Sequence, residues 1–133
     1  MANWYIFIFL FLSTFSIKAQ HLGQLNAFQP DEEYENIFVK KLYSDQHTST
    51  FIVWVKKEVK AHSHQKHTEQ VGVLEGKAEM TLGDQTFVVK KGDWIMIPQG
   101  TIHAVKVLSK KPVKVISIQT PEFKGKDRVF VKE

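Results

Sequence analysis

The chain has 133 residues, which is the size of one domain and enough to bury a hydrophobic core without cross-links. It contains no cysteine, so disulfides, thiolate zinc sites, iron–sulfur clusters and cysteine nucleophiles are excluded. Its 18 basic residues slightly outnumber the 14 acidic ones and are spread along the chain rather than gathered in one patch, so we expect no nucleic-acid partner.

The first nineteen residues differ in composition from the rest of the chain. Residues 4–17 are almost wholly apolar, and Ala19 places a small residue just before a polar one. This run is shorter than the roughly twenty residues that a membrane-spanning helix needs. We therefore interpret residues 1–19 as a secretory signal peptide cleaved after Ala19, with a retained membrane anchor as the alternative. The prediction is an exported protein, periplasmic or secreted, with no stable membrane anchor after cleavage.

Residues 20–35 are mostly polar and include the turn-forming run PDEE at residues 30–33. We interpret this stretch as a flexible lead-in to a single folded domain over residues 36–133. His21 and His47 stand alone in polar surroundings, so we expect both to be exposed and to bind no metal.

From residue 36 onward the sequence predicts strands. Short apolar or alternating runs are separated by glycine, proline and lysine pairs, and none of them keeps the 3.6-residue period of a helix. The expected strands cover residues 36–43, 50–59, 69–74, 77–82, 85–89, 94–97, 102–108 and 113–119, and a loop and an edge strand follow within residues 121–133. About eight to ten short strands predict an antiparallel β-sandwich or barrel. Residues 50–59 are apolar on both faces, which indicates a central strand or the interface of a homodimer.

Four of the six histidines lie in two short stretches, residues 62–69 and 92–103. In an extended backbone the side chains of His62 and His64 point to the same side, so both imidazoles can meet one ion. Glu69 adds a carboxylate and His103 adds a third imidazole. Three nitrogen donors and one oxygen donor suit a divalent transition metal such as Mn, Fe, Ni, Cu or Zn. The sequence therefore predicts a metal site.

The strand alternation places these donors at the mouth of an apolar interior. If Glu69 points inward, Val71 and Val73 share its face, and if His103 points inward, Val105 and Val107 do the same.

Other residues near the predicted site are candidates for contact with a substrate. His67 lies in the first histidine stretch, although a loop-facing imidazole is the favoured alternative. Trp94, Met96 and Gln119 lie on flanking strands, and core packing is the favoured alternative for Trp94 and Met96. Asp127 and Arg128 are interpreted as structural rather than catalytic.

These residues carry a resemblance to a known family. The run His62-x-His64-x4-Glu69-x6-Gly76 resembles the first motif of the cupin superfamily, and Gly92-x5-Pro98-x-Gly100-x2-His103 resembles the second. Two positions depart from the motifs, because Lys56 stands where the first usually begins with glycine and Val107 where the second usually ends with asparagine. Neither is a metal ligand. The resemblance implies a small single-domain cupin, a jelly-roll β-sandwich, that binds a divalent metal through His62, His64, Glu69 and His103.

Three functions fit this reading. The first is a metal-dependent enzyme of dioxygenase, decarboxylase or isomerase type that acts on a small oxygen-rich substrate, with Glu69 doubling as a catalytic proton acceptor. The second is an exported protein that binds a small molecule or sugar without catalysis. The third is metal capture or a structural role. Hydrolysis by a side-chain nucleophile is not expected, because the sequence has no Gly-x-Ser-x-Gly motif.

Overall fold

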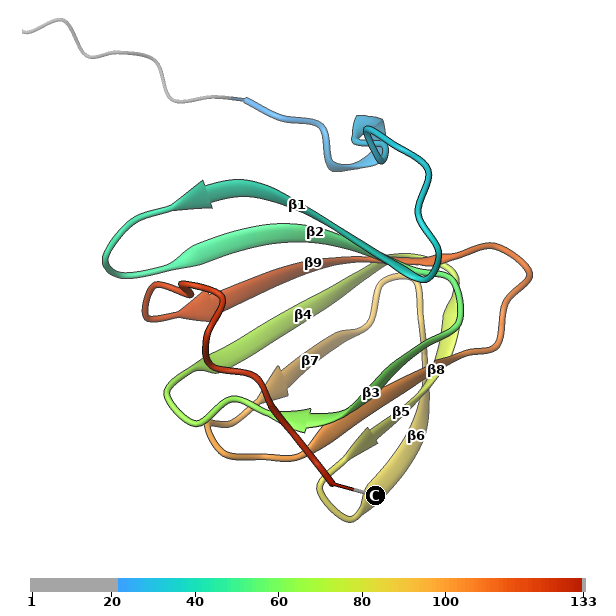
Figure 1. The fold of residues 1–133 in the computed structure, drawn as a ribbon. Helices are drawn as coiled ribbons and strands as arrows, with labels where there is room; N and C mark the ends of the chain where they lie inside the picture. The colour runs from blue at the N-terminus through green and yellow to red at the C-terminus, as the bar shows by residue number, and fades with distance from the viewer. Residues whose placement is uncertain (1–21, 133) are drawn as a thin grey trace, which may run out of the picture.

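The computed structural model describes residues 22–132, so the signal peptide predicted at residues 1–19 lies outside the described residues. Two five-stranded antiparallel sheets face each other as layers (Figure 1). The first sheet has the order β1 (Ile37–Ser44), β2 (Ser49–Val55), β9 (Val113–Thr120), β4 (Thr68–Glu75), β7 (Trp94–Ile97). The second has the order β10 (Val129–Phe130), β3 (Glu58–Ser63), β8 (His103–Val107), β5 (Lys77–Leu82), β6 (Gln85–Lys90). This confirms the all-β antiparallel sandwich that the sequence predicts.

One predicted strand is wrong, because residues 50–59 form two strands in different sheets. β2 ends at Val55 and β3 begins at Glu58. The side chain of Asn36 closes the turn between them, since its Oδ1 accepts hydrogen bonds from the backbone N–H groups of Lys57 (2.9 Å) and Glu58 (3.2 Å). Its Nδ2 donates to the Glu58 carbonyl at 2.8 Å. These side-chain bonds let the chain leave one sheet and enter the other.

The outer face of β2 is covered by the chain itself. Ile52 and Trp54 project to that face and are buried, next to the segment that contains the short 3-10 helix Leu25–Ala27. Lys114, on the neighbouring strand β9, is fully buried there. Its Nζ donates to the Phe28 carbonyl at 2.8 Å and lies 5.4 Å from the centre of the Trp54 ring. Burial of both faces of β2 is therefore explained within one chain.

The interior between the sheets has an apolar part and a polar part. The apolar core is formed by Val73, Ala78, Met80, Val89, Ile95, Ile97 and Val113. Along β4 the inward positions run from Glu69 through Val71 to Val73, and all three line the interior. The alternation predicted for this strand is thus confirmed, and it places the carboxylate at the polar end. No helix within residues 22–132 has the length and the apolar character that crossing a bilayer requires.

We expect Gly76→Ala to destabilise the protein more than Gly92→Ala does. Both glycines have positive φ, +83° and +94°, so alanine at either position costs about 1–2 kcal/mol of backbone strain. A Cβ at position 76 would also lie 2.9 Å from the Cα of Val113, whereas a Cβ at position 92 would meet nothing within 4 Å. Overpacking of this kind adds about 1–3 kcal/mol. Urea unfolding of both variants measures the difference, and equal losses would contradict the packing at Gly76.

Candidate metal centre

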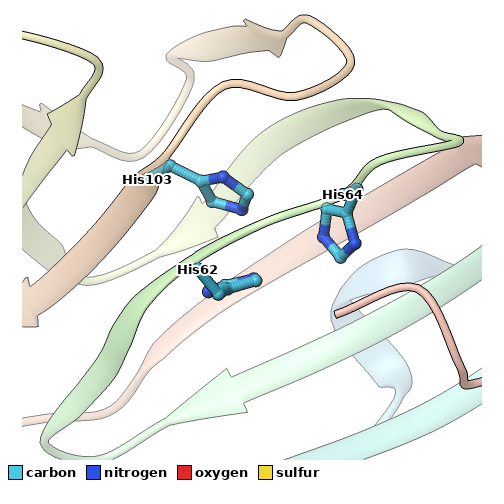
Figure 2. A group of neighbouring side chains, drawn as sticks. All are labelled: His62, His64 and His103. Atoms are coloured by element: carbon cyan, nitrogen blue, oxygen red, sulfur yellow. The ribbon is translucent and has the colours of Figure 1, made fainter. Parts of the chain in front are cut away.

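Three histidines from the second sheet meet inside the sandwich (Figure 2). His62 lies near the end of β3, His64 directly follows that strand, and His103 begins β8. His62 and His103 are direct partners in the β3–β8 pairing, and all three side chains are buried. One ligand atom from each of the three lies within 4.8 Å of those of the other two. The i, i+2 spacing and the cross-strand register together produce this convergence.

Hydrogen bonds to backbone carbonyls orient all three imidazoles. The Nδ1 atoms of His62, His64 and His103 lie 2.8, 2.7 and 3.0 Å from the carbonyl oxygens of Lys60, Asp127 and Thr101, respectively. A carbonyl can only accept, so each Nδ1 carries a proton, and in the neutral ring Nε2 then keeps the lone pair. This is the tautomer that binds a metal through Nε2. The donor set therefore fits a divalent transition metal.

Glu69 approaches the histidines from the opposite sheet. Its Oε2 lies 3.3 Å from Nε2 of His64 and 3.5 Å from Nε2 of His103. Its other oxygen, Oε1, accepts a hydrogen bond from the Ser117 hydroxyl on β9. Glu69 thus lies beside two of the three imidazoles, while the mutually close group itself consists of the histidines alone.

The surroundings shift the pKa values of these groups in different directions. Burial lowers the pKa of His62 to about 4, against the hydrogen bond to Lys60, which raises it. Burial would also lower the pKa of His64, but its interactions with Glu69 and Asp127 outweigh burial and raise it. Burial raises the pKa of Glu69, and its interactions with His103, His64 and Ser117 overcome that effect and hold the pKa below the ordinary range. Glu69 is therefore an ionised carboxylate, which suits a metal ligand.

The segment after β9 holds the histidine loop in place. The carboxylate of Asp127 accepts hydrogen bonds from the backbone N–H groups of Gln65 (3.0 Å) and Lys66 (2.7 Å). It also lies 2.5 Å from Nδ1 of His67, while its backbone carbonyl accepts from His64. Asp127 is therefore structural, as predicted, and it fixes the loop that carries one member of the three-histidine group.

A cavity of about 140 Å³ adjoins the three histidines. Its walls are mainly apolar, and Gln119 is one of the few polar residues in them. Gln119 is 4% exposed, and its Oε1 has no hydrogen-bond partner among residues 22–132. The structure thus brings this predicted substrate residue to the site. Phe123 also lines the cavity, with its ring centre 5.7 Å from that of His64.

Three other candidate residues, Trp94, Met96 and His67, do not line the cavity. Trp94 and Met96 are 61% and 48% exposed, because Ile95 and Ile97 occupy the inward positions of β7. Trp94 and Met96 therefore neither line the cavity nor join the core, so both roles expected for them, substrate contact and core packing, are wrong.

His67 is buried but does not line the cavity. Its ring nitrogens face the Asp127 carboxylate and the Glu122 carbonyl instead. The lone His47 is exposed, as predicted, and His21 lies outside the described residues.

Sequence reasoning missed two residues that surround the site. Ser117 shares the inward face of β9 with Gln119, so the alternation of that strand could have identified it. Arg128, interpreted as structural, lines the cavity from the C-terminal segment. No local pattern indicates this, because the segment returns to β3 from a distant part of the sequence.

The two antiparallel sheets and the three buried histidines between them identify the protein as a β-sandwich with a candidate metal site. The chain belongs to the cupin family, since residues 49–119 match the family described as Cupin domain.

The chain is similar to proteins from several organisms. An uncharacterized protein of Aquifex aeolicus (strain VF5) is 36% identical over 97 residues, which cover 73% of this chain and 79% of that protein. The mannose-1-phosphate guanylyltransferase RfbM of Salmonella typhimurium is 36% identical over 70 residues, which cover 53% of this chain but only 15% of that enzyme. A double-stranded β-helix protein of Klebsiella pneumoniae has a TM-score of 0.72 at 14% identity, covering 86% of this chain and all of that one. The last comparison supports the predicted jelly-roll fold.

We expect His62 to reduce the stability of the metal-free protein as the pH falls from 6.5 to 4, relative to a variant that lacks this imidazole. An unfolded histidine has a pKa of about 6.5, and that of folded His62 is about 4, so the unfolded chain binds more protons in this window. The full pKa shift corresponds to about 3 kcal/mol in the free energy of unfolding. His62→Asn should remove this contribution to the pH dependence. Urea unfolding of chelator-treated protein measures the profile, and at pH 8 the difference between the two proteins reports packing alone. Parallel pH profiles would contradict the assignment.

We expect Asp127→Ala to cost about 2–4 kcal/mol of stability, because it leaves two backbone N–H groups and His67 without their acceptor. Asp31→Ala is the matched control. It removes an exposed carboxylate that pairs with Lys40 at 2.6 Å, and exposed pairs contribute only about 0–1 kcal/mol. Urea unfolding compares the two variants. Similar losses would show that Asp127 does not hold the histidine loop.

Proposed function

We propose that the protein binds one divalent transition-metal ion through His62, His64, His103 and Glu69. The observation that carries the proposal is the shared tautomer of the three histidines, whose Nδ1 atoms all donate to backbone carbonyls. With Nε2 free on each ring, the fold has already arranged three nitrogen donors before an ion arrives. Imidazole and carboxylate donors together suit Mn, Fe, Ni, Cu or Zn.

We propose further that the site acts on a small oxygen-rich substrate, in a reaction of the dioxygenase, decarboxylase or isomerase type. A bound ion would supply Lewis-acid or redox chemistry next to the cavity. The apolar walls limit water around the reacting groups, and Gln119 offers an amide to a substrate. Glu69 is assigned as a ligand rather than as the principal proton acceptor, because a carboxylate with a lowered pKa is a weak base.

A non-catalytic small-molecule or sugar binder is the second candidate. Glu69 is the one predicted acid–base residue in the cavity wall, and its lowered pKa argues against proton transfer. The similarity to part of a mannose-1-phosphate guanylyltransferase points toward a sugar or sugar phosphate as the ligand type. Chelation separates the two candidates. An enzyme should lose turnover and regain it with one particular metal, whereas a binder should keep its ligand affinity with several ions.

We expect His103→Ala to lower the metal content of the purified protein from about one equivalent per chain to a small fraction of that. The substitution removes one of the four proposed donors, and the bond from Nδ1 of His103 to the Thr101 carbonyl supports this choice because it orients the ring. His47→Ala is the matched control, because His47 is exposed and outside the site. Elemental analysis measures both variants. Retention of one equivalent by His103→Ala would overturn the site assignment.

A further inference from the structure

Arg128 is the only arginine in the chain. It lies in the C-terminal segment between Asp127, which is bound to the histidine loop, and β10, which pairs with β3. Arg128 is exposed overall, yet it is one of the residues that line the cavity together with the three histidines. Among residues 22–132, no carboxylate lies within ion-pair distance of the guanidinium. A positive charge therefore stands beside the cavity with no carboxylate partner in the described part of the chain.

This charge is unfavourable for the site taken alone. It repels a metal ion. If the proposed function is correct, a divalent ion with Glu69 as its one anionic ligand carries a net charge of +1, and Arg128 increases the positive charge further. Excess positive charge beside apolar walls is costly unless an anion accompanies it.

Gln119 provides an independent polar contact in the same cavity. It is the direct cross-strand partner of Glu69, and its buried Oε1 has no partner in the described part of the chain. A buried acceptor left unpaired costs about 1–3 kcal/mol. A hydroxyl group of a ligand would satisfy it.

We propose that the ligand of this cavity is a small hydroxy carboxylate, whose carboxylate binds Arg128 and whose hydroxyl donates a hydrogen bond to Oε1 of Gln119. Arginine suits this role because its planar guanidinium forms two parallel hydrogen bonds with a carboxylate. The cavity of about 140 Å³ is close to the roughly 150 Å³ that accommodates benzene, a molecule of six heavy atoms. This inference rests on the proposed function and names the substrate class for it.

Lactate, propionate and lactamide test the proposal because they are similar in size. Lactate has both groups, propionate lacks the hydroxyl, and lactamide lacks the charge. Calorimetric titration of the metal-loaded protein should give the affinity order lactate, propionate, lactamide. Gln119→Leu should remove most of the advantage of lactate over propionate.

Arg128→Gln should weaken lactate and propionate binding by about tenfold and leave lactamide binding unchanged. Arg128→Lys, which keeps the charge, should recover part of the loss. Lys126→Gln is the matched control, because it removes the same charge from an exposed residue of the same segment that does not line the cavity. It should bind lactate as the wild type does.

Chemical modification gives a readout that needs neither a variant nor activity. Phenylglyoxal reacts selectively with arginine, and this chain offers it a single arginine. Lactate should slow the appearance of the adduct in mass spectra of the wild-type protein, whereas lactamide at the same concentration should not.

Elemental analysis of the same samples separates failure of this inference from failure of the proposed function. If the protein holds its metal but the three probes bind equally or not at all, or Arg128→Gln binds lactate as tightly as the wild type, the inference is overturned and the metal site stands. If the protein holds no metal, the proposed function fails. Protection of Arg128 by lactate then still decides whether the carboxylate site exists.

Discussion

Three hydrogen bonds from imidazole nitrogens to backbone carbonyls orient the rings of the candidate metal centre. They place the proton on Nδ1 of His62, His64 and His103 and leave each Nε2 available. The acceptors are backbone atoms, so the fold itself sets the tautomers. Two of the carbonyls belong to the residue two positions before the histidine, and the third comes from Asp127, 63 residues away. A site oriented by backbone needs few supporting side chains, which suits a small domain.

The C-terminal segment is part of the site. In Figure 1 it runs from the end of β9 in the first sheet to β3 in the second, crossing one end of the sandwich. Asp127 binds the histidine loop through its carboxylate and its carbonyl, and the neighbouring Arg128 lines the cavity. Two adjacent residues thus have different roles: Asp127 holds the histidine loop, and Arg128 places a positive charge beside the cavity. The short strand β10 keeps both in register with β3.

The interior is divided into an apolar core and a polar part that adjoin each other. Inward positions of β4 change from carboxylate to valine within four residues, so the apolar core begins directly beside the candidate metal centre. The low-dielectric wall strengthens every charge interaction in the polar part. It lowers the pKa of His62 and makes an unpaired charge or amide expensive. A ligand that pairs with the guanidinium of Arg128 and with Oε1 of Gln119 would therefore gain affinity, because it would remove the cost of leaving these groups unpaired.

The sequence by itself determined the all-β class, most of the strands and the inward phase of β4, because these depend on spacings of two to eight residues, and it identified the histidines as candidate ligands from their chemistry. It could not place Trp94 and Met96, since all four residues of β7 are apolar and such a run has no phase until a sheet packs against one face. It also could not find the break between β2 and β3, which depends on the side chain of Asn36. Only the tertiary structure brought Asp127 and Arg128 to the histidines, because contacts between residues some sixty positions apart leave no periodic signal in the chain.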